Sequence, residues 1–245
     1  MMPGGEMGTS QIHVDYQPDF GPARKAPGKT KRPPRSWRRR LLLTFLFIAG
    51  VSVALVLPFA VLVRVSVYLY SRGLGNWAAL GAAAVSVFAL LLLYVVVLRV
   101  RFQRKLSVPK LVRRGLVVVV AGYVGYALIY LSGANAKTEE IRSAYVALSP
   151  ILRVATGTVL LADQEAVVTD VGRTRADYVA WGLAVNEASL HFEQDDGFVH
   201  AVDLRTQGRP EWRNGALLTY YRVMGFRTLR HVGTADHLHV SLPVP

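Results

Sequence analysis

The sequence contains no cysteine among its 245 residues. This absence excludes disulfide bonds, thiolate metal sites and cysteine nucleophiles. A domain of this chain that lies outside the cell must therefore be stabilised by its hydrophobic core alone.

Charged side chains are missing from three long stretches, residues 41–63, 73–98 and 115–136. Each stretch is close to the roughly 20 apolar residues that cross about 30 Å of hydrocarbon. Aromatic residues such as Trp37, Trp77 and Tyr130 lie near their ends, as in interfacial belts. A soluble chain of this length is too small to bury three fully apolar helices. We therefore predict a membrane-embedded region, residues 41–136, with transmembrane helices at about 41–66, 76–98 and 115–134.

Acidic residues are scarce beside these spans, and the net charge of +13 comes from the flanking segments. Residues 1–40 hold nine Lys/Arg and three acids, and residues 99–114 hold seven Lys/Arg and no acid, whereas residues 137–245 hold eleven and thirteen. The positive-inside rule then makes the N-terminus and the 99–114 loop cytoplasmic and the C-terminal domain periplasmic or extracellular, with the chain in the cytoplasmic (inner) membrane. Anionic lipid head groups are the expected partner of these basic segments, and nucleic acid is not.

The composition of the first 40 residues, rich in Gly, Pro, Lys and Arg, predicts a disordered basic cytoplasmic tail. The spans have no Asp, Glu or Lys at their centres, so no ion or proton pathway is visible in them. A membrane scaffold or transport accessory remains an alternative in which the spans carry the function.

Residues 137–245 alternate between helical and strand patterns, which predicts an α+β extracytoplasmic domain with a small antiparallel sheet. The predicted helices are 138–161, bent at Pro150, then 174–181, and a third that Pro210 opens and Gly225 closes. The predicted strands are 166–170, 188–192, 198–204, 227–232 and 237–242.

Five of the six histidines fall in the last 55 residues: His191, His200, His231, His237 and His239. Because residues i and i+2 of a strand share a face, His237 and His239 are expected to point the same way. Two neighbouring imidazoles suit one divalent metal, or one metal ligand plus one acid/base group.

Asp203 stands in an otherwise apolar strand, and a buried carboxylate is costly unless it is paired or bound to a metal. Alternation places His200 on the opposite face of that strand, so His191 is the preferred partner for Asp203 in a metal site. A salt bridge from Asp203 to Arg205 or Arg173 is the alternative.

These residues resemble a known pattern. Ser189-x-His191, a following glycine, Ala201-x-Asp203 and a terminal Asp236-x-x-His239 are similar to the zinc metallopeptidase group of D-Ala-D-Ala carboxypeptidases/dipeptidases. The group includes phage peptidoglycan endopeptidases, the penicillin-insensitive murein endopeptidase and the hedgehog signalling domain. The ending 236–243, DHLHVSLP, most resembles the murein endopeptidases, and 169–173 resembles the Arg-terminated strand that precedes the first histidine. The likeness covers residues 138–245.

The resemblance implies that His191, Asp203 and His239 bind Zn²⁺, with water as the fourth ligand. It further implies that Asp236 is the general base, that His237 lies beside the site, and that Arg173 stabilises the oxyanion. His231 is either a residue that contacts the metal ligands without binding the metal or an ordinary strand histidine.

One spacing departs from the family. Twelve positions separate His191 from Asp203, where the family has seven, so either a bulge restores the register or His200 is the first ligand. The hypotheses are a membrane-anchored zinc peptidase acting on peptidoglycan stem peptides, as a carboxypeptidase or an endopeptidase, and a non-catalytic peptidoglycan- or protein-binding module of the same fold.

Overall fold

The computed structural model describes Gly21 and residues 37–102, 109–182, 184–186, 188–233 and 236–243. The predicted tail up to residue 36, apart from Gly21, and residues 103–108 of the basic loop therefore lie outside the described residues. The chain divides into two compact units, Met1–Leu46 and Phe47–Pro245. The contacts that follow all lie within the second unit.

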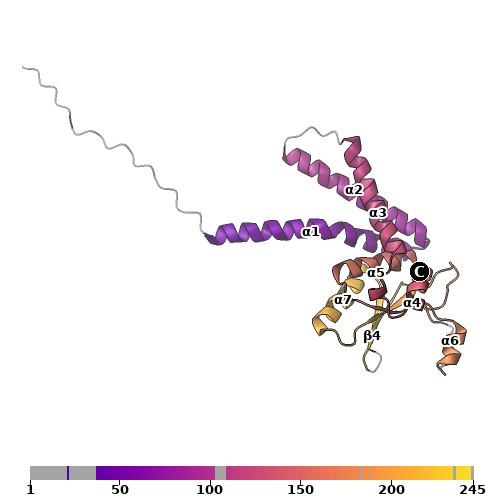
Figure 1. Ribbon diagram of the computed structural model, residues 1–245. Coiled ribbons are helices and arrows are strands. Elements are labelled where there is room, and N and C mark those ends of the chain that lie inside the picture. The colour runs from indigo at the N-terminus through magenta and orange to yellow at the C-terminus, as the bar shows by residue number, and fades with distance from the viewer. Residues whose placement is uncertain are drawn as a thin grey trace, which may run out of the picture. The chain divides into compact units, whose positions relative to one another are not determined.

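Three long apolar helices form the N-terminal half: α1 (Trp37–Tyr70), α2 (Asn76–Arg101) and α3 (Lys110–Ile129) (Figure 1). Each is long and apolar enough to cross a membrane. Most of their side chains are exposed on the isolated chain, including large aliphatic residues such as Leu55, Val85 and Val118. In water these surfaces would be unfavourable, whereas acyl chains accommodate them. The chain is a membrane protein, as its uncharged stretches predict.

The third helix begins and ends about five residues before the predicted span. It begins directly after Pro109, and beyond its end Ser132 caps a short 3₁₀ helix, η1 (Gly133–Asn135). The predicted helix 138–161 is broken rather than bent. It forms α4 (Glu139–Ala144), the 3₁₀ helix η2 (Tyr145–Ala147) and α5 (Pro150–Ala162). Pro150 has no N–H to donate and forces Ser149 into an extended conformation, so one helix ends and another begins.

The C-terminal half contains an antiparallel sheet in the order β1-β2-β4-β3. Its strands are β1 (Val168–Asp170), β2 (Ala201–Arg205), β3 (Arg227–His231) and β4 (His237–Ser241). Helix α6 (Arg175–Ala180) follows β1, and α7 (Glu211–Met224) connects β2 to β3. Gly225 ends α7 at a φ of 98°, which strains any residue with a Cβ. The predicted combination of a membrane helical half and an α+β domain is confirmed.

The predicted strand 188–192 is wrong, and β2 begins at Ala201 rather than at residue 198. Residues 188–192 form a turn-rich loop in which the Ser189 N–H donates to the Asn186 carbonyl and the Phe192 N–H to the Ser189 carbonyl. These local hydrogen bonds occupy groups that a sheet ladder needs. His191 therefore lies in a loop rather than in a strand of the sheet.

Helix α5 joins the two halves of the second unit. It is almost entirely buried and packs against α3, where a Cβ built on Gly157 would lie 3.0 Å from the Ala127 Cβ. Tyr123 of α3 and Thr158 of α5 also share a hydrogen bond of 2.5 Å. The sheet domain is thus packed directly on the ends of membrane helices.

Candidate metal site and the adjoining pocket

The β2–β4 pairing places Asp203 directly opposite His239. Directly opposed residues of antiparallel strands have Cβ atoms about 4.5–5.5 Å apart on one face, so these two side chains meet. The Asp203 Oδ1 and the His239 Nδ1 are 2.8 Å apart, and the Asp203 side chain is only 4% exposed. The family resemblance implied this pair, and the register of β2 and β4 accounts for it.

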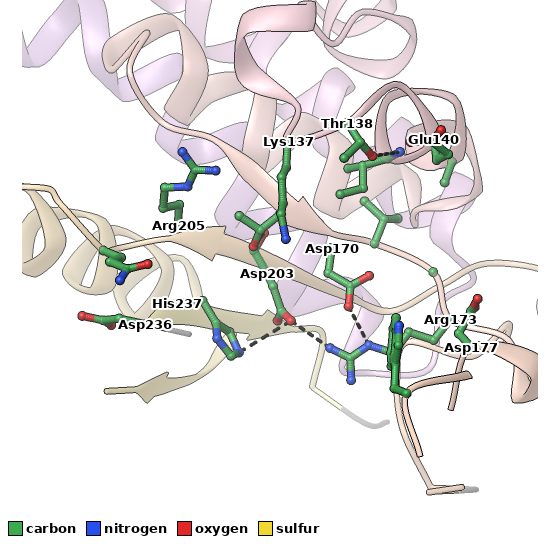
Figure 2. Close-up of a pocket in the computed structure, with 17 residues that line it drawn as sticks. Lys137, Thr138, Glu140, Asp170, Arg173, Asp177, Asp203, Arg205, Asp236 and His237 are labelled. Carbon is green, nitrogen blue, oxygen red and sulfur yellow. Dashed lines mark hydrogen bonds and ion pairs between the residues drawn. The ribbon is translucent and has the colours of Figure 1, made fainter. Parts of the chain in front are cut away.

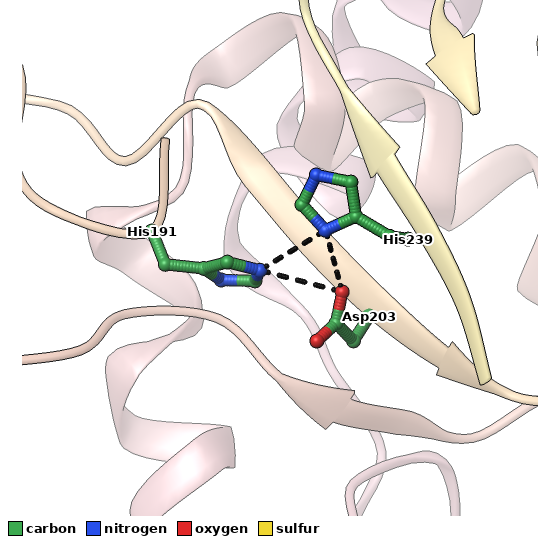
Figure 3. A group of neighbouring side chains, drawn as sticks. All are labelled: His191, Asp203 and His239. Carbon is green, nitrogen blue, oxygen red and sulfur yellow. Dashed lines mark hydrogen bonds and ion pairs between the residues drawn. The ribbon is translucent and has the colours of Figure 1, made fainter. Parts of the chain in front are cut away.

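His191 reaches the same point from the loop, as Figure 3 shows. Its Nε2 lies 3.2 Å from the His239 Nδ1 and 3.3 Å from the Asp203 Oδ1. Its Nδ1 lies 2.6 Å from the Val171 carbonyl oxygen, which can only accept a hydrogen bond. The proton of a neutral His191 is therefore on Nδ1, and the Nε2 lone pair points at the carboxylate of Asp203.

Either a proton on the His239 Nδ1 or a metal ion between the three side chains would satisfy these contacts. Their donor atoms all lie within 4.8 Å of one another. Ligands about 2.0–2.1 Å from a tetrahedral zinc ion are about 3.3–3.4 Å apart, which matches two of the three separations. The third pair, at 2.8 Å, would have to open by about half an ångström. A set of two imidazoles and one carboxylate, with one imidazole oriented by a carbonyl, fits zinc.

Arg173 holds the other oxygen of Asp203. Its NH2 donates to the Asp203 Oδ2 at 3.0 Å, and its Nε donates to the Asp170 Oδ2 at 2.6 Å. Burial opposes ionisation of Asp203, but when His191 and His239 carry protons on the nitrogens that face it, their hydrogen bonds and charge outweigh burial and hold the pKa of the Asp203 carboxyl well below the ordinary value. The salt bridge to Arg173 and the histidine cluster, considered as alternatives from the sequence, thus occur together.

His237 lies two residues before His239 and also points at Asp203, with its Nε2 3.6 Å from the Asp203 Oδ2. Its ring stacks on that of His231, its partner across β3 and β4, with centroids 4.6 Å apart. The expectation that His237 and His239 point the same way is met.

Asp236 belongs to a different hydrogen-bonding group. Thr206 donates to its Oδ1 at 2.5 Å, and the Arg230 NH2 lies 3.1 Å from its Oδ2. Hydrogen bonds from Arg230 and Thr206 hold the pKa of the Asp236 carboxyl below its usual range. A carboxylate stabilised in this way is a weak base, and its predicted role as general base stays a prediction.

A pocket of about 890 Å³ adjoins the triad (Figure 2). Asp203 belongs to both, whereas His191 and His239 do not line the pocket. Its wall includes the other predicted catalytic residues, Arg173, Asp236 and His237, and two exposed cations, Lys137 and Arg205. The sequence motif gave no indication of these cations, which flank β1 because the backbone N–H groups of Lys137 and Arg205 donate to Val168 and Val167.

His200, the alternative first ligand, points away from the triad. Its Nε2 contacts both oxygens of Asp196 at 2.9 and 3.0 Å, and its Nδ1 lies 3.3 Å from the Tyr70 hydroxyl of α1. Asn76 of α2 donates to Asp196 at 2.5 Å and accepts from Ser149 at 2.5 Å. Sequence reasoning missed this network because its members are separated by up to 130 positions.

No protein-family model matches the chain, and neither curated proteins nor solved structures gave a match. The class of site is therefore defined by its own geometry. Two buried residues, His191 and Asp203, and the half-buried His239 form a group that could hold a metal ion in a membrane protein. The likeness to zinc peptidases stays a prediction from the residues.

Proposed function

We propose that this protein is a membrane-anchored zinc-dependent peptidase that acts on the stem peptides of peptidoglycan. The observation that carries the proposal is the convergence of the His191 Nε2, the His239 Nδ1 and the Asp203 Oδ1 around one point, with the His191 lone pair turned inward by the Val171 carbonyl. Three protein ligands leave zinc a coordination position for water, which is the arrangement of catalytic rather than structural sites.

A bound zinc ion lowers the pKa of its water towards 7 and polarises a carbonyl group. The side chains around it have separable roles. His237 contacts Asp203 and lines the pocket, so we assign to its imidazole the uptake and return of a proton. Arg173 fixes the Asp203 carboxylate and offers positive charge near developing oxyanions. Lys137 and Arg205 suit the free carboxylates that peptide substrates carry.

The proposed location follows from charge. Arg and Lys are concentrated before α1 and between α2 and α3, which favours a cytoplasmic position for those segments and an outer position for the α+β domain. On that side of the inner membrane the site would face the cell wall.

The test uses the full-length protein in detergent with zinc, incubated with uncross-linked and cross-linked muropeptides and analysed by mass spectrometry. We expect loss of one amino acid from the stem or opening of the cross-link, and no product from Asp203→Ala. The matched control is Asp195→Ala, which removes an exposed carboxylate from the His191 loop and should leave turnover unchanged. Equal product from Asp203→Ala and the wild type would refute the proposal.

A second candidate is a non-catalytic module that binds a wall peptide or a protein through the same zinc site. The engagement of Asp236 by Arg230 and Thr206 favours it, because this leaves the pocket without a free carboxylate base at that position. One zinc per chain, together with peptide binding and no cleavage of any muropeptide, would identify this alternative.

A further inference from the structure

A second, mostly apolar cavity lies between α1, α5 and α7. This α5–α7 groove has a volume of about 390 Å³. Most of its wall is aliphatic or aromatic: Val56 from α1, Val159 and Ala162 from α5, and Trp212, Ala216, Leu217 and Tyr220 from α7. Its lining suits a hydrocarbon chain rather than a polar ligand.

Helices α7 and α1 approach each other near both ends of α7. At one end, the Arg64 NH1 donates to the Met224 carbonyl at 3.3 Å. At the other end, Val56 and Trp212 face the same cavity. Val56 and Arg64 are eight helical rises apart, so the two places lie about 12 Å apart along α1.

The groove is continuous with the lipid-facing surface of α1. Val56 is 63% exposed, and its neighbours Val53 and Leu55 are 62% and 67% exposed. All three belong to a helix that is long and apolar enough to span a membrane. Since acyl chains must cover this surface, they also reach the mouth of the groove that Val56 lines.

Helix α7 carries the residues of an interfacial helix on its outer side. Trp212 and Val223 are 71% and 60% exposed, and Ala216 between them is also exposed. Positions 212, 216 and 223 lie on one helix face. The Arg213 guanidinium lies 5.4 Å from the Trp212 ring, an arrangement that suits the boundary between hydrocarbon and head groups.

Charge in the groove is already neutralised. Asp163 pairs with Arg209 and lies 3.8 Å from the Arg213 NH1, and Arg213 also pairs with Glu165. Arg213 is therefore not available as a dedicated anion site. Recognition of a lipid here rests on its chain and not on an anionic head group.

We propose that the α5–α7 groove binds an acyl chain of a phospholipid from the leaflet next to the α+β domain, and that α7 lies in the membrane interface. The domain is then seated on the bilayer with a fixed orientation instead of moving on a tether. This holds whether or not the metal site is catalytic.

The cysteine-free chain allows a direct test. Single variants Ala216→Cys and Val223→Cys carry a nitroxide spin label in the full chain, reconstituted in phosphatidylcholine nanodiscs. The control is Val179→Cys on α6, a site that is 72% exposed. Electron paramagnetic resonance then measures collisions with oxygen, which concentrates in lipid, and with chromium oxalate, which stays in water. We expect Ala216→Cys and Val223→Cys to favour oxygen and Val179→Cys to favour chromium oxalate.

Two results would overturn the proposal. Labels on α7 that collide with chromium oxalate as often as the label on Val179→Cys would place α7 in water. Labels on α7 that are shielded from both reagents would show that protein, such as a second copy of the chain, covers the groove. The Trp212 emission of a Trp37→Phe/Trp77→Phe/Trp181→Phe chain gives an independent check, because brominated acyl chains should quench it only if lipid contacts it.

Discussion

The Val171 carbonyl oxygen lies 2.6 Å from the Nδ1 of His191, and both groups are buried. This contact fixes the proton of His191 on the nitrogen that faces away from Asp203. The His191 lone pair then faces the Asp203 carboxylate, and either a proton on the His239 Nδ1 or a metal ion between them would offset the repulsion. The hydrogen bond thus prepares the histidine as a metal ligand, in the way that carbonyl partners orient histidines in known metal sites.

The first prediction concerns zinc stoichiometry. The full-length protein should bind one zinc ion per chain, and His191→Ala, Asp203→Ala and His239→Ala should each weaken binding by more than the about 10–100-fold typical of changes in residues that only support ligands. Elemental analysis measures the zinc stoichiometry, and competition with a chelator measures the zinc affinity of each variant.

The control for that series is His200→Ala, which removes a histidine that contacts Asp196 and Tyr70 instead of the triad. It should retain one zinc per chain. If His200→Ala loses zinc while His191→Ala keeps it, the assignment of His191 as the first ligand is wrong.

A second prediction compares two helical glycines. A Cβ at Gly157 would meet the Ala127 Cβ at 3.0 Å and the Ala127 Cα at 3.2 Å, so α5 and α3 must separate to admit it. Overpacking costs about 1–3 kcal/mol, which exceeds the about 0.5–1 kcal/mol that alanine contributes to a helix. Gly157→Ala should therefore lower the melting temperature in detergent.

The matched variant is Gly215→Ala in α7, where the added Cβ has nothing within 4 Å. Because the new methyl group meets no neighbour, the higher helix propensity of alanine should stabilise the protein by about 0.5–1 kcal/mol. Melting temperatures that change in opposite directions in these two variants would separate the effect of helix packing from that of helix propensity. A melting temperature raised by Gly157→Ala would contradict close packing of α5 on α3.

A third prediction addresses the connection between the membrane helices and the His191 loop. Asn76 is 3% exposed and links Ser149 to Asp196. Asn76→Ala leaves the buried Ser149 hydroxyl without its acceptor and removes one donor from Asp196, which keeps its contacts with His200. The change should cost about 1–3 kcal/mol of unfolding free energy. Thermal unfolding followed by circular dichroism measures the loss.

Zinc binding should survive this change, because Asn76 contacts neither the triad nor the pocket wall. Ser71→Ala provides the comparison, since Ser71 is exposed and donates only to the Tyr68 carbonyl of its own helix. It should alter stability by less than about 0.5 kcal/mol. Similar losses from both variants would argue against a special role for the buried network.

Local pattern in the sequence determined a large part of this protein. The uncharged stretches specified three membrane helices, because length and apolar composition alone decide whether a helix can cross hydrocarbon. The period of two in a strand placed His237 and His239 on one face, and the β2–β4 register turns that face toward Asp203. The position of Asp203 between apolar neighbours predicted that its buried carboxylate pairs with cationic or hydrogen-bonding side chains. Arg173, His191 and His239 are these side chains.

Only the tertiary structure decided how His191 arrives at the site. The sequence favoured a strand for residues 188–192, but local hydrogen bonds around Ser189 form a loop, and the Val171 carbonyl then orients the ring. The same is true of the break at Pro150 and of the contact between Tyr70 and His200. These features depend on groups distant in the chain or on competition between local and ladder hydrogen bonds, and periodicity carries no information about either.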